Sequence, residues 1–582
     1  MIRKLLSSVR EYKKPTLLTF LFILGEVVIE CLIPFFTADL VNQLKAGIEM
    51  KTLLFTGLML VLMALISLTL GGTAGYTSAK AAAGFAKNLR NDIFDRIQGY
   101  SFENIDKFYS SSLVTRLTTD VSNVQMAYMM TIRTAVRSPL MLIFSIIMAA
   151  RMGGRLAMTF IVIVPVLGIG LFCIARLAMP AFHRVFKKYD KLNESIEENV
   201  RAMRVVKGFA REEHEKEKFG HAAEEIRSNF VKAERIVAFN NPLMQLCLYF
   251  NMIFVLTVGS NLVITSRGSA LDVGHISAML TYSMQILMAL MMLSMIYVML
   301  TMSMESGKRI AEVLDEESTL KNPAEPVMEV KDGSIDFENV SFKYSKKAKK
   351  YALSDVNLHI KSGMTVGVIG GTGSSKSSLV QLIPRLYDVT EGTVSVGGVD
   401  VRDYDIETLR DSVAMVLQKN QLFSGTIKEN LRWGNAEATD EELIEACKLA
   451  QADEFVSTFP AGYDTYIEQG GTNVSGGQKQ RLCIARALLK KPKILILDDS
   501  TSAVDTKTDT LIRKGFKEFI PDTTKIIIAQ RISSVEDADM ILVMENGKIS
   551  DAGSHAELLE SCSIYQEIYE QQTSGKAGEA DE

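Results

Sequence analysis

The sequence predicts a multidomain protein: an all-α, six-helix transmembrane domain followed by an α/β domain that carries a helical subdomain. Apolar stretches of roughly 20 residues, long enough to cross a bilayer, recur as far as residue 303. From Val330 onward, short runs rich in β-branched residues alternate with helical patterns. Between residues 305 and 326 the composition changes abruptly to charged and polar, which marks the join between the two parts.

Length and composition exclude several classes of protein. At 582 residues the chain is too long for one domain. Its formal net charge of −4 argues against nucleic acid as the main partner. The six cysteines show neither CxxC nor Cys/His ligand spacing, so we interpret them as reduced packing residues.

Six apolar stretches are predicted to span the membrane. They lie near residues 17–40, 54–77, 134–152, 155–179, 240–264 and 274–303. An even number of spans puts both chain ends on one side, and basic segments at 80–96 and 184–218 mark that side as cytoplasmic. Residues 1–15 are predicted to form an interfacial elbow helix on the cytoplasmic face, because Leu5, Leu6 and Val9 lie among basic neighbours. The apolar run after them is too long for a signal peptide. We therefore expect a multi-pass protein of the cell membrane with a cytoplasmic C-terminal domain.

Two long segments on the cytoplasmic side, 78–133 and 180–238, have a helical pattern. They are predicted to continue the spans into the cytosol, with a short crosswise segment at each tip. The alternative is a pair of independent coiled coils. The full division is a transmembrane domain at 16–310, a linker at 311–329, an α/β domain at 330–570 and a disordered tail at 571–582.

Two features of the spans bear on what the protein carries. Glu26 and Glu30 lie four residues apart and share one helix face. They form either a cation-attracting wall of a substrate cavity or a helix-packing hydrogen bond near the leaflet edge. The last span carries a methionine stripe at helical period, which either lines a tolerant cavity or is plain packing surface. Its members are Met284, Met288, Met291, Met295, Met299 and Met302.

A small-residue loop after the apolar run 364–369 is predicted to hold phosphate groups. Its backbone N–H groups can face one anion, and the helix that follows adds partial positive charge at its N-terminus. Lys376 supplies a charge for the outer phosphates and Ser377 a hydroxyl for Mg²⁺. Ser375 stands where GxxxxGK[ST] asks for glycine, and a positive φ there would cost about 1–2 kcal/mol. The loop consists of Gly370, Gly371, Thr372, Gly373, Ser374, Ser375, Lys376, Ser377 and Ser378.

Further polar residues follow buried strands or open helices. The run 494–498 ends in Asp498, which can hold Mg²⁺ opposite Ser377, and Asp499 follows it. Gln418 ends another apolar run, and its amide oxygen suits Mg²⁺ or an attacking water. Gln530 ends the run 526–529 in the same way. A second anion site is expected at a helix start, formed by Ser475, Gly476, Gly477 and Gln478.

This ordered set of motifs resembles that of an ATP-binding cassette (ABC) exporter half-transporter over nearly the whole chain. The resemblance implies that ATP and Mg²⁺ are the cofactors and that Tyr344 stacks on adenine. Residues 370–378 correspond to Walker A, Gln418 to the Q-loop and Asp498 to Walker B. Residues 475–478 match the signature, with Val474 in place of its usual Leu. Residues 500–505 match the D-loop, and 468–473 resemble the exporter X-loop.

Three departures from the family pattern concern the nucleotide held by this chain's own Walker motifs. Asp499 stands where the family has a Glu that acts as general base or organiser, and its side chain is one methylene, about 1.5 Å, shorter. A displacement of ~1 Å can reduce a rate about a hundredfold. Gln530 occupies the position where the family has its switch histidine, and a glutamine side chain cannot carry charge. Ser375 is the third departure.

The departures predict the degenerate-site subunit of a heterodimeric exporter. Its own site binds ATP but hydrolyses it weakly, with Asp499, Gln530 and Gln418 as the catalytic positions, and its signature completes the site of a non-identical partner. The alternative is a homodimeric lipid or peptide exporter with slow ATPase activity. A soluble cassette ATPase would lack the spans, and a channel on the same fold would carry passive current. The substrate cannot be identified from the sequence; export of a small molecule, of the multidrug type, is implied by the resemblance alone.

Overall fold

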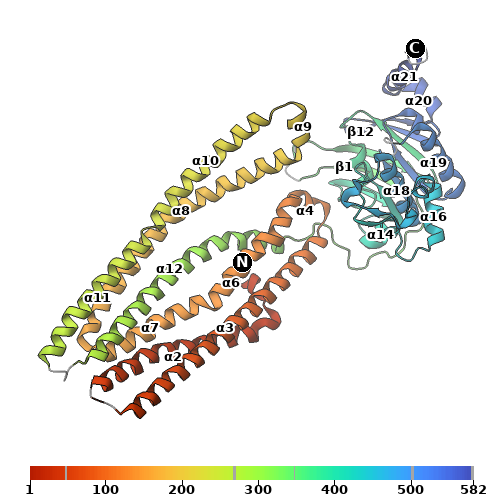
Figure 1. Ribbon diagram of the computed structural model, residues 1–582. Helices are drawn as coiled ribbons and strands as arrows, with labels where there is room; N and C mark the ends of the chain where they lie inside the picture. The colour runs from red at the N-terminus through yellow and green to blue at the C-terminus, as the bar shows by residue number, and fades with distance from the viewer. Residues whose placement is uncertain (46, 48, 267–270, 346–347, 500–503, 579–582) are drawn as a thin grey trace. The chain divides into compact units, whose positions relative to one another are not determined.

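The computed structural model describes residues 1–45, 47, 49–266, 271–345, 348–499 and 504–578 (Figure 1). The chain divides into two compact units. The first contains residues 1–98 and 109–316, and the second contains residues 99–108 and 317–582. Each is described separately below.

The first unit is entirely helical. Its long helices continue well beyond the length that a bilayer needs, as expected for the segments 78–133 and 180–238. The elements are α1 (Ile2–Ser7), η1 (Arg10–Tyr12), α2 (Lys13–Lys45), α3 (Met50–Gln98), α5 (Ser110–Thr115), η2 (Arg116–Asp120), α6 (Val121–Ile132), α7 (Thr134–Gly153), η3 (Gly154–Met158), α8 (Thr159–Arg201), α9 (Met203–Gly208), α10 (Glu212–Val237), α11 (Asn240–Thr265) and α12 (Val273–Asp315).

Within the described residues, five helical stretches are long and apolar enough to cross a membrane. They are Arg10–Lys45, Met50–Gln98, Ser110–Phe182, Glu212–Thr265 and Val273–Asp315. The third of them contains α7 and α8, which correspond to the predicted third and fourth spans and are separated by the 3₁₀ turn η3. The count of six spans therefore stays a prediction.

The N-terminal segment is fixed to the long helices. Gly84 of α3 leaves room for the Tyr12 ring, since a Cβ at residue 84 would lie 2.1 Å from it. Arg10 forms an ion pair with Asp92, and Lys4 forms one with Asp315 at the end of α12. The elbow predicted over residues 1–15 is thus helical up to Tyr12, and α2 begins at Lys13.

An ion-paired cluster joins α2 to α7. The Arg137 guanidinium lies 3.2 Å from Glu26 and 2.6 Å from Glu30. Because one cation holds both carboxylates, this arrangement favours the packing alternative over a free cation-attracting wall. Sequence reasoning missed Arg137, although an arginine in an apolar stretch is itself a signal.

The methionine stripe lies along one side of α12. Met284, Met288, Met295 and Met302 are exposed within this chain. Nothing in the single chain shows what faces them, so a role in lining a cavity stays a prediction.

The second unit is α/β and also includes the short helix α4 (Phe102–Lys107). Its strands are β1 (Ile335–Phe342), β2 (Leu353–Ile360), β3 (Thr365–Gly370), β4 (Glu391–Val396), β5 (Val399–Asp400), β6 (Val413–Val416), β7 (Gly425–Thr426), β8 (Tyr466–Ile467), β9 (Ile494–Asp498), β10 (Thr524–Ile528), β11 (Met540–Glu545) and β12 (Lys548–Gly553). Its other helices are α13 (Lys376–Gln381), α14 (Ile406–Ser412), α15 (Ile427–Leu431), α16 (Asp440–Leu449), α17 (Asp453–Val456), η4 (Gly462–Asp464), η5 (Gln469–Gly471), α18 (Gly476–Leu489), α19 (Thr506–Phe519), η6 (Ile532–Ser534), α20 (His555–Ser561) and α21 (Ser563–Gly578).

The main sheet of this unit has the order β12-β11-β3-β10-β9-β6. The strands β11, β3, β10, β9 and β6 are parallel, and β12 is antiparallel at one edge. A second, antiparallel sheet has the order β2-β1-β4-β5. Alternate residues of β9 enter different cores: Leu495 and Leu497 pack with α16 and α18, whereas Ile494 and Ile496 pack with the second sheet.

The C-terminal helix differs from the predicted tail. The structure has α21 helical to Gly578, whereas the sequence predicted disorder from residue 571. Gln572 anchors this part of the helix, because its side chain accepts a hydrogen bond from the Ile532 N–H (2.9 Å) and donates one to the Gln530 carbonyl (2.8 Å). Such side chain-to-backbone contacts cannot be predicted from a Gly-, Ala- and Glu-rich composition.

Candidate nucleotide site

The strand order of the main sheet brings the predicted site residues together. The neighbouring parallel strands β3, β10, β9 and β6 all end at one edge, where ligands of such sheets bind. The Walker A loop follows β3, and Gln530 follows β10. Asp498 is the last residue of β9, and Gln418 follows β6. Residues up to 160 positions apart in the chain therefore meet at one edge.

The backbone of the Walker A loop has the shape that the sequence required. Gly370 has φ +155°, and a Cβ there would lie 2.2 Å from the Met544 carbonyl oxygen, so a larger residue does not fit. A Cβ at Gly371 would meet nothing within 4 Å, which leaves that side of the loop open for a ligand. Ser375 has φ +71° and ψ +27°, in the left-handed region. The expected strain at Ser375 is therefore confirmed in its geometry.

The charged groups of the loop are partly buried. The Lys376 ammonium donates to the carbonyl oxygens of Gly370 (2.8 Å) and Gly371 (3.0 Å). Burial lowers the pKa of Lys376, and the carboxylates of Asp498 and Asp499 oppose this shift. Burial raises the pKa of Asp498, which receives a hydrogen bond from Ser377. Two buried carboxylates facing one lysine leave an excess of negative charge, which a bound cation would neutralise.

Asp499 is held by amide groups on two sides. Its Oδ2 accepts hydrogen bonds from the side-chain amides of Gln418 (3.2 Å) and Gln530 (2.8 Å). The Gln480 amide donates to its backbone carbonyl (3.3 Å). Asp499 is buried and has φ +49°, a region that aspartate tolerates better than most residues. All three predicted catalytic positions thus meet at one carboxylate oxygen.

The segment that carries Gln530 is fixed from behind by Gln572. The two hydrogen bonds from Gln572 bracket residue 531, one on each side. The position of Gln530, and hence its contact with Asp499, therefore depends on α21. Sequence reasoning missed Gln572, which no local pattern distinguishes from its neighbour Gln571.

An aromatic cluster links the predicted adenine platform to α4. The Tyr344 hydroxyl shares a hydrogen bond with Ser378 (2.8 Å), and its ring lies 5.2 Å from the Tyr387 ring, nearly perpendicular to it. The Tyr387 hydroxyl donates to Asp106 of α4 (2.6 Å), and its ring contacts Phe102 at 6.0 Å. Burial is the main cause that raises the pKa of Tyr387, so the hydroxyl remains a proton donor at neutral pH. Sequence reasoning did not single out Tyr387.

The signature residues lie at an exposed helix N-terminus. Ser475 caps α18, accepting a hydrogen bond from the Gln478 N–H (3.3 Å), while the Gln478 side chain accepts one from the Ser475 N–H (2.9 Å). Ser475 and Gly476 are exposed. The predicted anion site is thus an exposed helix N-terminus, about 100 positions along the chain from the Walker A loop.

The remaining predicted loops are described in part. Residues 500–503 of the D-loop lie outside the described residues, and Asp505 caps α19. The X-loop residues 468–473 form a turn in which Asn473 accepts from the Glu468 N–H (3.0 Å) and Thr472 donates to the Glu468 carboxylate (2.8 Å).

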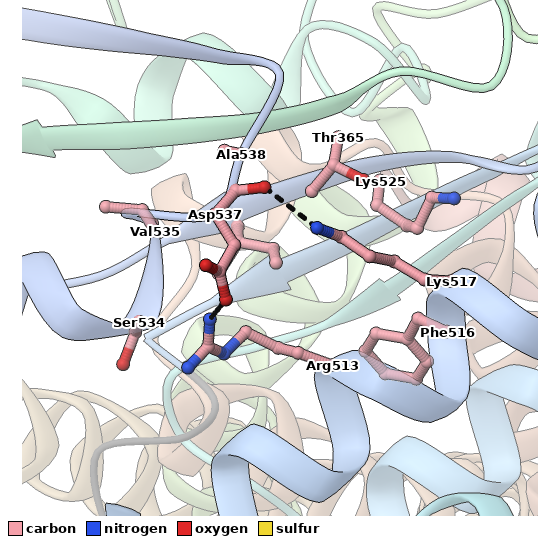
Figure 2. Close-up of a pocket in the computed structure, with 10 residues that line it drawn as sticks. Thr365, Arg513, Phe516, Lys517, Lys525, Ser534, Val535, Asp537 and Ala538 are labelled. Carbon is pink, nitrogen blue, oxygen red and sulfur yellow. Dashed lines mark hydrogen bonds and ion pairs between the residues drawn. The ribbon is translucent and has the colours of Figure 1, made fainter. Parts of the chain in front are cut away.

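A pocket on the same unit is not the nucleotide site. Figure 2 shows it between α19 and the segment after β10, next to the ion pair between Arg513 and Asp537 (2.8 Å). Thr365 and Lys525, which line it, lie at the start of β3 and near the start of β10, at the edge of the sheet opposite the Walker loop. Its volume of about 20 Å³ holds little more than one water molecule.

Comparison with known proteins identifies the family. Residues 16–291 match the ABC transporter transmembrane region, and residues 353–502 match the ABC transporter family. An uncharacterized ABC transporter ATP-binding protein, YfiB of Bacillus subtilis (strain 168), is 34% identical over 579 residues, which cover 100% of both chains. A fatty acid ABC transporter ATP-binding/permease protein of Mycobacterium tuberculosis (strain CDC 1551 / Oshkosh) is 34% identical over 480 residues, covering 82% of this chain and 75% of that protein.

The fold agrees with this assignment. A bacterial Atm1-family ABC exporter with ATP bound has a similar structure, with a TM-score of 0.83 and 24% sequence identity, covering 97% of this chain and 98% of that chain. The chain therefore belongs to the ABC transporter family: it is a multi-pass membrane protein that joins an ABC transporter transmembrane region to an ATP-binding domain and couples ATP hydrolysis to transport.

Proposed function

We propose that this chain is one half of a heterodimeric exporter of the cell membrane. Its own Walker site binds ATP but hydrolyses it slowly, and its signature completes a competent site on a non-identical partner. The chain crosses the membrane six times, and its ATP-binding domain is cytoplasmic.

The observation that carries this proposal is the environment of Asp499. A general base must reach the proton that it removes by a hydrogen bond. The Asp499 carboxylate is one methylene shorter than a glutamate, and its Oδ2 already accepts amide hydrogens from Gln418 and Gln530. Gln530 supplies no positive charge. This arrangement supports binding of a nucleotide and opposes activation of a water molecule.

The signature supports the second part of the proposal. Ser475 and Gly476 are exposed at the N-terminus of α18, where a helix end and its N–H groups favour an anion. In the family, two cassettes close head to tail, so that each signature serves the nucleotide of the other chain. The departures in this chain are therefore confined to its own nucleotide, while the partner's nucleotide receives an almost complete signature.

The tip of the second cytosolic segment, which contains α9, has features that support the presence of a partner chain. The helix α9 is assigned to the first unit, whereas α4, at the other tip, is assigned to the ATP-binding unit. Apolar side chains around α9 are exposed, including Val205, Met203 and Phe209, which is 76% exposed. A cavity of about 600 Å³ lies beside them, between the ends of α8 and α10. We propose that the partner's ATP-binding domain covers this tip.

The residues at the sheet edge fit a magnesium ion. Ser377, Asp498 and Gln418 offer the oxygen ligands that Mg²⁺ prefers. No cluster of three or more His, Cys, Asp or Glu that could hold a metal occurs in the described ranges. The ion would therefore also need oxygen atoms from phosphates and water, which is the usual way that Mg²⁺ binds with a nucleotide. When bound, it would neutralise phosphate charge.

For the cargo, we propose an amphipathic lipid-like molecule with an acidic head. The relative named as a fatty acid ABC transporter supports this class over the multidrug class implied by the resemblance alone. The proposal predicts ATP-dependent movement of a long-chain fatty acid.

The test is to purify the tagged chain from its own host after mild crosslinking, identify the copurified protein, and assay the pair in inverted membrane vesicles. We expect a second half-transporter with Glu and His at the positions of Asp499 and Gln530, and ATP-dependent uptake of palmitate. Recovery of the tagged chain only as a homodimer, with full transport activity, would contradict the heterodimer. Passive ion current without ATP-dependent uptake would indicate a channel.

A further inference from the structure

Three helices of the transmembrane domain contribute charged or small residues at the same spacing of four. They are Glu26 and Glu30 on α2, Gly71 and Gly75 on α3, and Arg133 and Arg137 beside or on α7. A spacing of four keeps both members on one helix face. The three pairs meet, because a Cβ on Gly71 would lie 3.1 Å from the Glu26 carboxyl group and a Cβ on Gly75 would lie 3.7 Å from the Arg133 guanidinium.

The two arginines of this cluster differ in their partners. Arg137 is held by both carboxylates, at 3.2 Å and 2.6 Å, and the Glu26 side chain is only 12% exposed. The Arg133 guanidinium is exposed and makes no hydrogen bond or ion pair with any residue that the structure describes. The two acids thus occupy Arg137 and leave Arg133 as the charge that an external group can reach.

The backbone is interrupted where Arg133 lies. The helix α6 ends at Ile132 and α7 begins at Thr134, and Arg133 between them has φ −106° and ψ −71°. Within a membrane span, such irregular backbone is tolerated only where it is packed against protein or lines a cavity. The interruption places the Arg133 side chain over Gly75 of α3, where no side chain competes with it.

The depth of Arg133 can be counted along the helices. Thr19 of α2 and Thr77 of α3 share a hydrogen bond (2.8 Å), which fixes the register of the two helices. Gly75 therefore lies level with about residue 21 of α2, which is roughly 6 Å inside the predicted start of that span at residue 17, at a rise of ~1.5 Å per residue. Arg133, the last residue of the segment 78–133 that was predicted to be cytosolic, thus lies just inside the hydrocarbon, where an unpaired cation is costly and an anionic partner is favoured.

An apolar track continues from this point toward the outer leaflet. On α3 the residues on the face of Gly75 and Gly71 include Leu68 and Val61, by helical spacing. Leu68 is 70% exposed within this chain, and Val61 is exposed as well. From Gly75 to Val61 the helix rises about 21 Å, more than the ~15 Å hydrocarbon thickness of one leaflet. The track is long enough for the tail of a lipid.

We infer that Arg133 binds the carboxylate head of a single-chain amphiphile that enters from the cytoplasmic leaflet, with the acyl tail along Leu68 and Val61 of α3. This inference rests on the proposed function and names the residue that recognises its cargo. The Glu26–Arg137–Glu30 cluster removes the second arginine, so the site accepts one negative charge.

The test uses photo-crosslinking of the full-length chain, with its partner, in phosphatidylcholine nanodiscs. The probe is a palmitate analogue with a diazirine in its tail, and labelled peptides are mapped by mass spectrometry. In the wild type we expect saturable labelling of α3 between residues 61 and 68. Replacing Arg133→Gln is expected to raise the half-saturating concentration about tenfold or more, since a hydrogen bond to a charged group is lost. Arg133→Lys should retain part of the affinity.

The matched control is Arg151→Gln, which removes an exposed arginine near the opposite end of α7. It is expected to label as the wild type does. The corresponding alcohol analogue, which lacks the carboxylate, is expected to bind Arg133→Gln and wild type equally. ATP binding and the thermal unfolding midpoint of each variant show that it is folded.

Unchanged labelling in folded Arg133→Gln would overturn the inference, as would absence of labelling in the wild type or equal loss with the alcohol. The proposed function is tested separately. If labelling depends on Arg133 but the pair moves no palmitate, the binding site is supported and the proposal of a fatty acid cargo is contradicted. If the pair moves palmitate and labelling does not depend on Arg133, the fatty acid cargo is supported and the binding site at Arg133 is contradicted.

Discussion

At the scale of single residues, two departures from the family pattern meet in the nucleotide site. Asp499 lies where a glutamate is expected, and the amide of Gln530 lies where an imidazole is expected. In the structure these two replacements contact each other, at 2.8 Å, so each stabilises the other. Changing only Asp499 to Glu, or only Gln530 to His, would alter one side of this hydrogen bond and leave the other side as it is. The pair is therefore the unit on which a mutation should act.

Restoring both residues should restore hydrolysis. In a complex whose partner has its own catalytic acid neutralised, Asp499→Glu with Gln530→His is expected to raise ATP turnover about a hundredfold or more, because the carboxylate regains its reach. Turnover of the purified complex gives the measurement. Asp499→Asn is the control and should leave the low rate unchanged. A double variant as slow as the wild type would count against the assignment.

Ser375 is the second residue-scale case. Its φ of +71° is a conformation that glycine adopts freely and serine does not. Ser375→Gly is expected to remove about 1–2 kcal/mol of strain, offset by roughly 0.5–1 kcal/mol of added freedom in the unfolded chain. The net change is a small stabilisation, read from denaturant unfolding of the transporter. Ser374→Gly, whose backbone does not have positive φ, should instead destabilise it. Equal changes in stability for Ser375→Gly and Ser374→Gly would contradict the claim that Ser375 is strained.

At the scale of elements, the Tyr387 hydroxyl fixes α4 to the ATP-binding unit. Tyr387→Phe keeps the ring contacts with Phe102 and Tyr344 but removes the hydrogen bond to Asp106. A bond to a charged acceptor contributes about 1.5–3 kcal/mol. We expect faster amide exchange in residues 99–108, measured by mass spectrometry, with unchanged ATP affinity. Asp106→Asn keeps an acceptor oxygen and should show a smaller effect; the same exchange in wild type and Tyr387→Phe would show that the bond is not needed.

The C-terminal helix makes a similar contact. Gln572 holds the backbone on both sides of residue 531, and this fixes Gln530 next to Asp499. Gln572→Ala is expected to speed amide exchange at residues 530–534, since two hydrogen bonds are lost, and Gln571→Ala should leave it unchanged. Hydrogen-exchange mass spectrometry on the two variants decides this. If the exposed neighbour Gln571 has the larger effect, α21 does not position the switch segment.

The elements also show what the sequence could and could not predict. The Walker loop was predicted in detail because strand, loop, helix and the strain at Ser375 are all local. The meeting of Gln418, Gln530 and Asp499 depends on strand order, which the resemblance implied and spacing alone did not. Tyr387 and Gln572 were missed, since their partners lie 281 and 40–42 positions away and neither belongs to a local pattern. Arg137 differs from these two residues, because an arginine in an apolar stretch is a local signal; only its pairing with Glu26 and Glu30, more than 100 positions away, depends on the fold.

At the scale of the whole molecule, the proposed function requires a second, non-identical chain. Its own nucleotide site has Asp499 and Gln530 where the family has Glu and His, whereas Ser475 and Gly476 of its signature are exposed. Around α9, the first unit has exposed apolar side chains, among them Val205 and Phe209. A partner with an intact Glu and His would supply the hydrolysis, and ATP held at this chain's site would keep the two cassettes associated.

The central claim is that this polypeptide holds ATP and seldom cleaves it. The most direct test is the rate of ATP hydrolysis by the full-length chain purified without any second half-transporter, compared between wild type and Asp499→Asn. The account predicts that both bind ATP and that both hydrolyse it at the same low rate. Robust hydrolysis by the wild type that Asp499→Asn abolishes would contradict it.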